Sequence, residues 1–328
     1  VSPGTFDPAP GLGNPHLQTL YAALLARAPR PPFRRERWET PDDDFVDVDF
    51  IDGPADAPWV HLYHGLEGSS NSPYARTLMD QTRRRGWRGS VFHFRGCSGE
   101  PNRLPRAYHS GDTAEIDWSV RRVKEMAGAA PLFVAGISLG GNAFAKWLGE
   151  QGANLPPEIR AVAAVSTPFD LGAGSRHLEQ GFSRAYVRHF VKALKRKAFE
   201  ALKRHPDLPV DRARLQSAKS FWDFDDVFTA PVHGFAGADD YYSRSSSLQF
   251  LDRIAIPTLL YSAVNDPFLP ASVLDKVRQI SAGNPMLHNE FTPTGGHVGW
   301  VSGSPLAPVY HMERYVTSWL EAQSEGFR

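Results

Sequence analysis

The feature that most constrains this chain is a pentapeptide at residues 136–140, which reads Gly-Ile-Ser-Leu-Gly. In a chain with 28 glycines, the pattern Gly-x-Ser-x-Gly alone has little specificity. Here it directly follows the apolar stretch 132–137 and directly precedes a helical stretch at 142–150. This context predicts a sharp strand-to-helix turn that holds Ser138 in a strained backbone conformation. The flanking glycines are needed because a β-carbon would collide with the neighbouring backbone.

Strand-like and helix-like stretches alternate on both sides of this turn. Segment 45–51 alternates apolar and acidic residues, which predicts a half-exposed edge strand. The alternation as a whole predicts a mostly parallel sheet covered by helices. Further strands are expected at 59–63, 90–94, 132–137, 159–166, 258–264 and 287–291, and helices at 16–26, 73–85, 112–126, 142–150 and 311–322.

The alternation stops after Pro168. Residues 170–250 contain no clear strand and have much helical character. We therefore expect an α/β core formed by residues 1–168 and 251–328, with residues 169–250 inserted as a helical cap or lid. The aromatic residues between 221 and 228 are expected to pack this cap, with the lining of an acyl pocket as the alternative.

Charge and composition limit the partners. Lys+Arg and Asp+Glu both number 36, so no overall attraction to nucleic acid is expected. No apolar run approaches a membrane span and no signal peptide is visible, which predicts a cytoplasmic protein without stable membrane insertion. The basic segment 189–204 is expected to be a solvated surface of the cap, with transient contact to anionic lipid as the alternative. The single cysteine, Cys97, excludes a disulfide framework.

A serine hydroxyl becomes a good nucleophile only when a neighbouring base takes its proton. Among 12 histidines, His297 has the most suitable position, because it lies in the glycine-flanked loop 295–299 after the last expected strand. From that loop it can reach Ser138. The competing interpretation is a turn histidine that contacts only solvent.

The acid that orients the base should follow the preceding strand. Asp266 lies where the expected strand 258–264 ends, and from there it could accept the Nδ1–H of His297. An Asx turn before Pro267 is the simpler explanation of the same residue. Asp170 is the main competitor, because it also follows a strand.

Two backbone N–H groups are candidates for an oxyanion hole. The N–H of Leu139 lies at the start of a helix, where it has no intrahelical acceptor. The second donor is expected in the loop after the first central strand, at residues 64–68, and the N–H of Leu66 is the candidate. A plain connecting loop is the alternative.

Beyond these residues, the sequence resembles the YheT-like branch of the α/β-hydrolase superfamily. The resemblance spans nearly the whole chain and implies the α/β-hydrolase fold and a carboxylic-ester hydrolase. It also implies eukaryotic relatives that are lipases or alcohol acyltransferases acting on medium-chain acyl groups, and it favours Asp266 over Asp170 as the acid. The motifs that carry it are residues 14–20, 64–69, 94–99, 102, 108–111, 239–242 and 265–268.

Together these observations predict a serine carboxylic-ester hydrolase that acts through an acyl-enzyme on short- to medium-chain acyl esters. Its partner is expected to be a small ester, with no metal and no organic cofactor. One alternative is an alcohol O-acyltransferase with the same triad, and another is a non-catalytic binding protein on this scaffold. A dehalogenase is disfavoured because it would need a carboxylate at Ser138.

Overall fold

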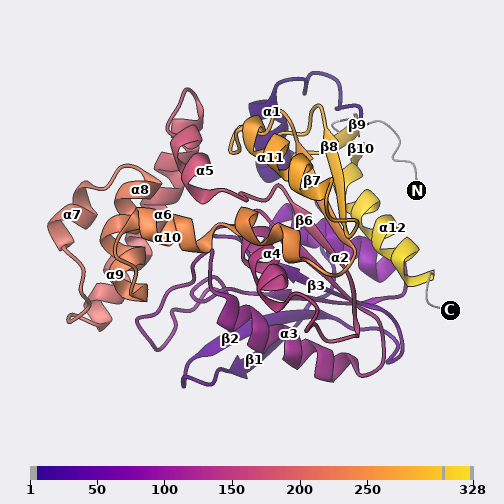
Figure 1. Cartoon of the computed structure of the whole chain (residues 1–328), viewed down its shortest axis with the longest axis horizontal. Helices are drawn as coiled ribbons and strands as arrows, with labels where there is room; N and C mark the ends of the chain where they lie inside the picture. Colours follow the sequence, from indigo (N-terminus) through magenta and orange to yellow (C-terminus); the bar gives the residue numbers. More distant parts are fainter. Residues whose placement is uncertain (1–5, 305–306, 326–328) are drawn as a thin grey trace.

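The computed structural model describes residues 6–304 and 307–325 (Figure 1). Its centre is a sheet with the strand order β1-β2-β4-β3-β5-β6-β7-β8. The pairs β1–β2 and β2–β4 are antiparallel, and the other neighbouring strands are parallel. The strands are β1 Arg34–Glu39, β2 Phe45–Ile51, β3 Trp59–Tyr63, β4 Arg88–Phe92, β5 Leu132–Ile137, β6 Ile159–Val165, β7 Thr258–Ala263 and β8 Leu287–Thr292.

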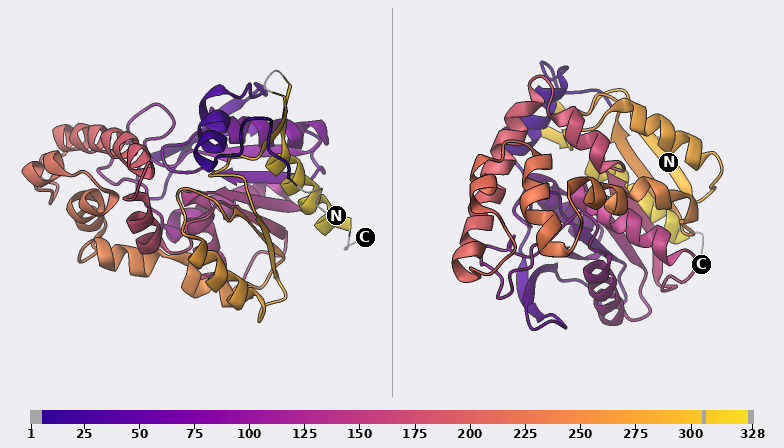
Figure 2. Two further views of the ribbon diagram at one scale, coloured as in Figure 1. Left: turned by 90° about the horizontal axis from the view of Figure 1, so that it is seen from above. Right: turned by 60° about the vertical axis from the view of Figure 1, so that its left-hand side comes forward.

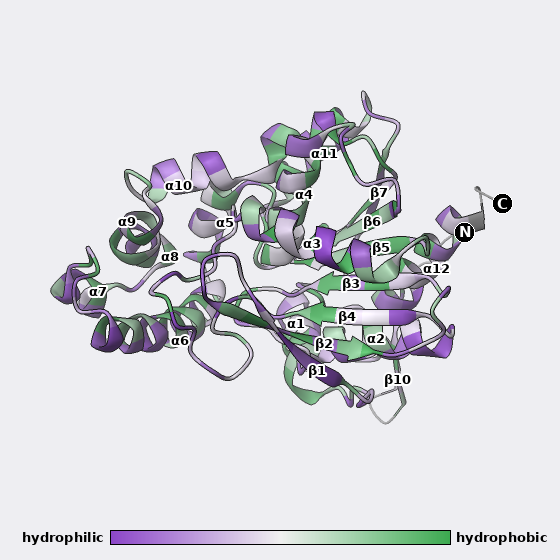
Figure 3. Ribbon diagram, turned by 90° about the horizontal axis from the view of Figure 1, so that it is seen from below, coloured by the Kyte–Doolittle hydropathy of each residue, from purple (hydrophilic) through white to green (hydrophobic). Residues whose placement is uncertain are grey.

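Helices cover both faces of the sheet, as Figure 1 shows. Helices α2 (Pro73–Arg84) and α12 (His311–Glu325) pack against one face, where Met79 and Val316 are buried. Helices α3 (Thr113–Ala127), α4 (Leu139–Gln151) and α11 (Ala271–Ser281) pack against the other. The strands between them are apolar, which Figure 3 shows as green along β3 and β5. The predicted fold class is confirmed.

The prediction that segment 45–51 forms a half-exposed edge strand was wrong. Strand β2 is buried along its whole length, because β1 pairs with it on the outer side. The acidic residues of β2 meet arginines of β1: Arg35 Nε lies 2.7 Å from Asp49 Oδ1, and Arg37 Nε lies 2.8 Å from Asp47 Oδ1. Charge pairing therefore lets these carboxylates be buried. Since β1 itself is so rich in arginine and glutamate, its sequence gave no strand signal.

Between β6 and β7, every described element is a helix, as expected for residues 169–250. We call these residues the helical insertion; Figures 1 and 2 show it to one side of the sheet. It has an apolar cluster of its own that includes Leu202, Leu215 and Phe224. Its elements are α5 Leu171–Leu178, α6 Ser183–Arg204, α7 Arg212–Ser217, α8 Phe221–Phe224, η2 Asp225–Thr229, α9 Ala230–His233, α10 Ala238–Ser245 and the start of η3 Ser247–Arg253.

Four small elements, in two pairs, flank the regular core. The N-terminal segment forms α1 (Pro15–Leu20) and the single turn η1 (Tyr21–Leu25). Strands β9 (Val301–Ser304) and β10 (Ala307–Tyr310) pair antiparallel just before α12. The sequence did not predict this pair, because glycine, serine and proline there resemble a loop. α1 packs against the loop that carries His297, and β9 directly follows that loop.

Candidate active site

Ser138 lies in the predicted sharp turn between β5 and α4. Its backbone has φ 53° and ψ −119°, a conformation that residues with a side chain rarely adopt. Its N–H donates to the carbonyl of Val165 at 2.8 Å, which helps hold the turn. The predicted strained conformation of Ser138 is therefore confirmed.

The glycines around Ser138 allow its turn to pack tightly. A β-carbon on Gly136 would lie 2.6 Å from Gly141 Cα, and one on Gly140 would collide with the carbonyl oxygen of Tyr63. Both contacts are with backbone, so no side-chain movement could relieve them. The Gly-x-Ser-x-Gly pattern is thus a packing requirement of this strand-to-helix turn.

The structure brings Ser138, His297 and Asp266 together in one line. His297 Nε2 lies 3.0 Å from Ser138 Oγ, and His297 Nδ1 lies 2.8 Å from Asp266 Oδ2. Asp266 is only 3% exposed, and its Oδ1 accepts the backbone N–H of Phe268 at 2.8 Å. With one carboxylate oxygen held by the backbone, the other is fixed toward the imidazole. This is the arrangement by which a carboxylate orients a general base.

Asp170, the competing acid, has a different role in the structure. It is the N-cap of helix α5, where its Oδ1 accepts the N–H of Ala173 at 2.9 Å. It follows β6, the strand beside β7, so its place in the sequence was a reasonable one for the acid. The contact with His297 is nevertheless made by Asp266.

The N-terminal segment holds the histidine loop, a role that the sequence did not reveal. Gln18 Oε1 accepts the N–H of Gly295 at 3.0 Å, and Thr19 Oγ1 accepts the N–H of His297 at 2.9 Å. Gln18 and Thr19 are buried in α1. They lie within the motif 14–20 that carried the family resemblance, and that motif was the only signal available. Gln18 and Thr19 therefore fix the backbone of the loop that carries the imidazole.

The loop 64–68 lies beside Ser138, as predicted for an oxyanion loop. A β-carbon on Gly65 would come within 3.2 Å of Ser138 Cβ. Neither Leu66 N–H nor Leu139 N–H has a hydrogen-bond acceptor among the described residues. Both donors therefore remain free for a ligand atom next to Ser138.

Hydrogen bonds hold the backbone of this loop in place. The N–H of Gly65 donates to Tyr74 Oη at 2.9 Å, and the N–H of Glu67 donates to Tyr108 Oη at 2.9 Å. His64 shapes the loop, because its Nδ1 contacts the Gly65 carbonyl and its Nε2 accepts the N–H of Phe94. Burial lowers the pKa of His64 to about 3, so it remains neutral. A neutral imidazole is required for Nε2 to accept that bond.

Lys197 of the helical insertion contacts the oxyanion loop. Lys197 Nζ on α6 lies 2.8 Å from Glu67 Oε1 and 3.6 Å from Cys97 Sγ. Tyr108 donates its hydroxyl to the same Glu67 oxygen at 2.9 Å. Burial raises the pKa of Cys97 to about 12, so its thiol stays protonated. Cys97 is thus a packed residue without nucleophilic character.

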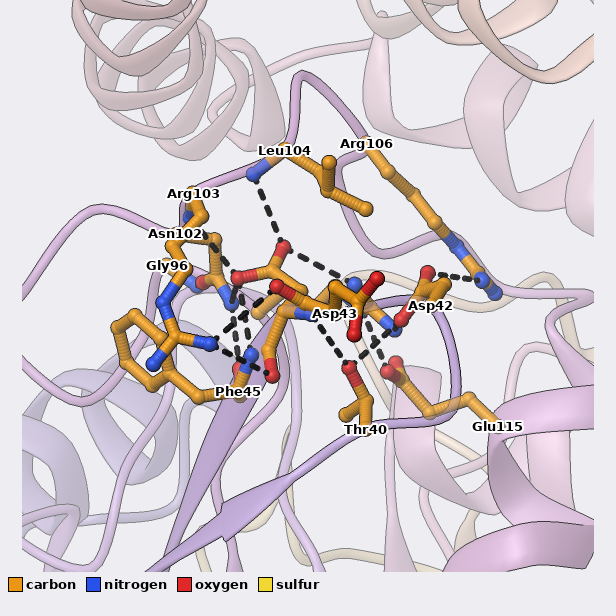
Figure 4. A network of polar contacts seen from close by, with 12 residues as sticks. Thr40, Asp42, Asp43, Phe45, Gly96, Asn102, Arg103, Leu104, Arg106 and Glu115 are labelled. Carbon is orange, nitrogen blue, oxygen red and sulfur yellow. Dashed lines mark hydrogen bonds and ion pairs between the residues drawn. The ribbon is translucent and has the colours of Figure 1, made fainter.

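The long loop between β4 and α3 forms another wall of the site, and a polar network anchors it (Figure 4). Arg95 is buried and contacts three carboxylates, those of Asp42, Asp44 and Glu115. Asn102 Nδ2 donates to Asp44 Oδ1 at 3.1 Å. Burial and nearby Asp112 raise the pKa of Glu115 to about 7, whereas Arg95 and Arg106 favour its ionised form. The network fixes the loop against the turn before β2.

A cavity of about 940 Å³ leads to Ser138 and His297. Apolar side chains of the helical insertion line much of it, including Phe190, Leu194 and Phe228. The aromatic segment 221–228 contributes both to the apolar cluster of the insertion and to this lining, so the two sequence interpretations are not exclusive. An apolar cavity of this size suits a ligand with a hydrocarbon chain.

The described residues hold neither a candidate metal site nor a membrane-spanning helix. No cluster of three or more His, Cys, Asp or Glu side chains within residues 6–304 and 307–325 could hold a metal ion. In the same part of the chain, no helix is both long enough and apolar enough to cross a bilayer.

Comparisons with known proteins agree with this fold. The family described as alpha/beta hydrolase fold matches residues 58–302. The chain is 42% identical to YheT of Escherichia coli (strain K12), an esterase by name, over 99% of this chain and 95% of YheT. It is 27% identical to the phospholipase ABHD3 of Mus musculus, over 94% of this chain and 76% of that protein. The esterase Pf2001 of Pyrococcus furiosus has the same fold, with a TM-score of 0.54 and 16% identity over 92% of this chain and 95% of that one.

The parallel sheet, the strained serine turn and the Ser–His–Asp line together define the class of α/β hydrolases. The chain belongs to the alpha/beta hydrolase fold family, in its YheT-like branch, and is an enzyme of the esterase and lipase type.

Proposed function

We propose that this protein is a serine carboxylic-ester hydrolase that forms an acyl-enzyme on Ser138. The observation that carries the proposal is the line from Ser138 Oγ through His297 to Asp266, with separations of 3.0 and 2.8 Å. Both distances are within hydrogen-bonding range, so proton transfer from the hydroxyl to the imidazole needs no rearrangement.

In the proposed first step, His297 Nε2 takes the proton of Ser138 Oγ as that oxygen attacks the ester carbonyl carbon. The carbonyl oxygen becomes an oxyanion, which the N–H groups of Leu66 and Leu139 stabilise; one such donor is worth about 3 kcal/mol. Asp266 stabilises the imidazolium without taking its proton. The C–O bond to the alcohol then breaks, and His297 gives its proton to the departing alkoxide.

In the second step, water replaces the alcohol. His297 removes a proton from water as the water oxygen attacks the acyl-enzyme carbonyl. The bond between the carbonyl carbon and Ser138 Oγ breaks, His297 returns the proton to the serine, and the free acid leaves. Every proton in this cycle moves through one imidazole, so the chemistry is complete with this chain's own groups.

We further propose short- to medium-chain acyl esters as substrates and residues 169–250 as the cap that selects them. The support is the apolar lining that Phe190, Leu194 and Phe228 give to the cavity beside Ser138. We also propose a cytoplasmic location, which the single Cys97 supports, because an oxidising compartment favours paired cysteines.

The test uses purified protein and p-nitrophenyl esters of graded acyl length, with Ser138→Ala as the comparison. We expect the wild type to hydrolyse esters with a preference within the short to medium range, and Ser138→Ala to lose this activity. No hydrolysis by the wild type, or equal activity in Ser138→Ala, would refute the esterase proposal. The same assay in water–ethanol mixtures identifies the acyl acceptor. A product that is mainly the free acid supports hydrolysis, and a product that is mainly the ethyl ester shows acyl transfer to alcohol.

A further inference from the structure

Seven large hydrophobic side chains are exposed within residues 6–304 and 307–325, and four of them occupy two adjoining segments. Leu17, Leu24 and Leu25 lie on α1 and η1, and they are 49%, 74% and 72% exposed. Phe182, 55% exposed, directly precedes α6. The ring of His16 contacts that of Phe182 with centroids 4.8 Å apart, which places the two segments side by side. We call these four residues the apolar rim.

The apolar rim lies at the cavity that leads to the site. Leu24 and Phe182 both line that cavity, together with Ser138. From Phe182 a series of aromatic contacts runs inward, first to Tyr186 at 5.8 Å, then to Phe268 at 4.8 Å. Exposed apolar groups that gather in one patch often mark a binding surface. Here that surface continues directly into the cavity.

The segments that carry the apolar rim are basic. No acidic residue occurs between Asp7 and Glu36, or between Glu179 and Glu200. Figure 3 shows α6 largely in the hydrophilic colour. Within the described part of the chain, five exposed cations of these segments form no ion pair with an acidic side chain: Arg27, Arg30, Arg184, Arg188 and Lys192. Arg34 and Arg35, at the start of β1, pair with carboxylates instead.

We propose that the apolar rim and the surrounding cations dock this protein onto a lipid surface that carries anionic head groups, with the cavity mouth facing the lipid. Apolar side chains bounded by unpaired arginines and lysines are complementary to such a surface, where acyl chains lie beneath negative charge. A second copy of the chain is a poorer occupant, because a symmetric contact would bring the same cations together.

Docking does not depend on hydrolysis, whereas delivery of a lipid ester to Ser138 rests on the proposed function. A lipid-soluble ester could pass from the surface along Phe182 and Tyr186 without crossing water. The exposed cations would orient the protein on the anionic surface. The apolar rim would make the strength of binding depend on how tightly the lipids pack.

Vesicle co-sedimentation tests the proposal. Phosphatidylcholine vesicles are compared with vesicles that also contain phosphatidylglycerol, using the wild type and the double variant Leu17→Ser/Leu25→Ser, neither residue of which lines the cavity. We expect the wild type to prefer the anionic vesicles, and the double variant to need at least about tenfold more lipid. Arg184→Gln/Arg188→Gln should lose the preference for anionic lipid. Met126→Ser, an exposed apolar residue on α3, is the matched control and should bind as the wild type does.

Three results would overturn the proposal: no binding of the wild type to anionic vesicles, unchanged binding of Leu17→Ser/Leu25→Ser, or equal loss in Met126→Ser. Light scattering tests whether a second copy of the chain binds the apolar rim instead. A wild type that is a dimer, with a monomeric Leu17→Ser/Leu25→Ser, would assign the rim to self-association. A water-soluble ester separates the two proposals. Leu17→Ser/Leu25→Ser should hydrolyse it at the wild-type rate, and vesicle binding without any hydrolysis would refute the esterase proposal while leaving docking supported.

Discussion

The ring of Phe268 lies parallel to the imidazole of His297, with centroids 4.0 Å apart and an interplanar angle of 6°. Phe268 follows Asp266 by two residues, and its N–H donates to the same carboxylate that contacts His297. The segment 266–268 therefore contacts the imidazole in two ways: Asp266 binds the ring edge, and Phe268 stacks on the ring face. The edge contact fixes the tautomer, and the stacked ring limits tilting.

We predict that Phe268→Leu lowers kcat by about tenfold, the upper range for loss of one stacked aromatic contact. The physical reason is that the imidazole can tilt away from Ser138 when only an aliphatic group lies beside it. KM should change less than kcat, because the alignment matters most in the transition state. Phe33→Leu, a partly buried ring away from the site, is the control. An unchanged kcat in Phe268→Leu would show that Asp266 alone fixes the ring.

Asp266→Asn should lower kcat by about 10⁴-fold, because an amide can donate to Nδ1 and so stabilise the unproductive tautomer. Asp170→Asn is the matched variant, since asparagine also caps helices well. Its activity should remain near that of the wild type. Steady-state kinetics on one p-nitrophenyl ester compares the two directly. A larger loss in Asp170→Asn would transfer the role of the acid to that residue.

Gly296→Ala should displace the histidine loop. Gly296 has φ +59°, and a β-carbon there would lie 2.6 Å from the carbonyl oxygen of Pro15. We expect a loss of stability of about 1–3 kcal/mol and a larger proportional loss of activity. Gly13→Ala, where a β-carbon meets nothing within 4 Å, should be neutral in both thermal unfolding and activity. Full activity in Gly296→Ala would mean that the contact with α1 does not position His297.

Lys197→Met tests the contact between the helical insertion and the oxyanion loop. A partly exposed ion pair is worth somewhat under 1 kcal/mol, so kcat should fall by about threefold as Glu67 loses its partner. Lys203→Met removes a pair with Glu200 on the same helix, where both side chains are well exposed, and should leave kcat unchanged. If the two variants behave alike, the insertion does not influence the loop through Lys197.

The stability of the protein should depend on pH through Glu313. Burial raises the pKa of Glu313 from 4.5 to about 7 in the folded chain, where Thr77 Oγ1 donates to it. Between these values the unfolded chain releases the proton and the folded chain keeps it, so this contribution to stability is lost as pH rises from about 4.5 to about 7. The loss amounts to about 3 kcal/mol.

Glutamine has no proton to release, so Glu313→Gln should lack this loss. The free energy of unfolding of the variant, relative to that of the wild type, should therefore be higher at about pH 8 than at about pH 5. Denaturant unfolding at the two pH values measures this. Glu125→Gln, an exposed glutamate on α3, should show no such difference. If Glu313→Gln has the same pH profile as the wild type, the carboxyl of Glu313 is already ionised in the folded protein at neutral pH.

Sequence patterns predicted most of the regular core, because these patterns are local. Strands 59–63 and 132–137 have the predicted bounds, since each is a short apolar run next to a clear turn. Strand β1 was not predicted, because its charged residues form ion pairs with β2 that exist only in the folded sheet. The same pairing buried β2, which its alternating pattern had indicated as an exposed edge.

For the candidate site, the sequence by itself determined the turn around Ser138, because strand, glycines and helix adjoin one another and strain the backbone locally. It also indicated His297 through chain order. Only the tertiary structure decided which carboxylate meets the imidazole, because Asp170 and Asp266 follow neighbouring strands and the distance to His297 depends on sheet packing. Likewise, the bond from Gly295 to Gln18 joins residues far apart in the chain, and no local pattern records such a contact.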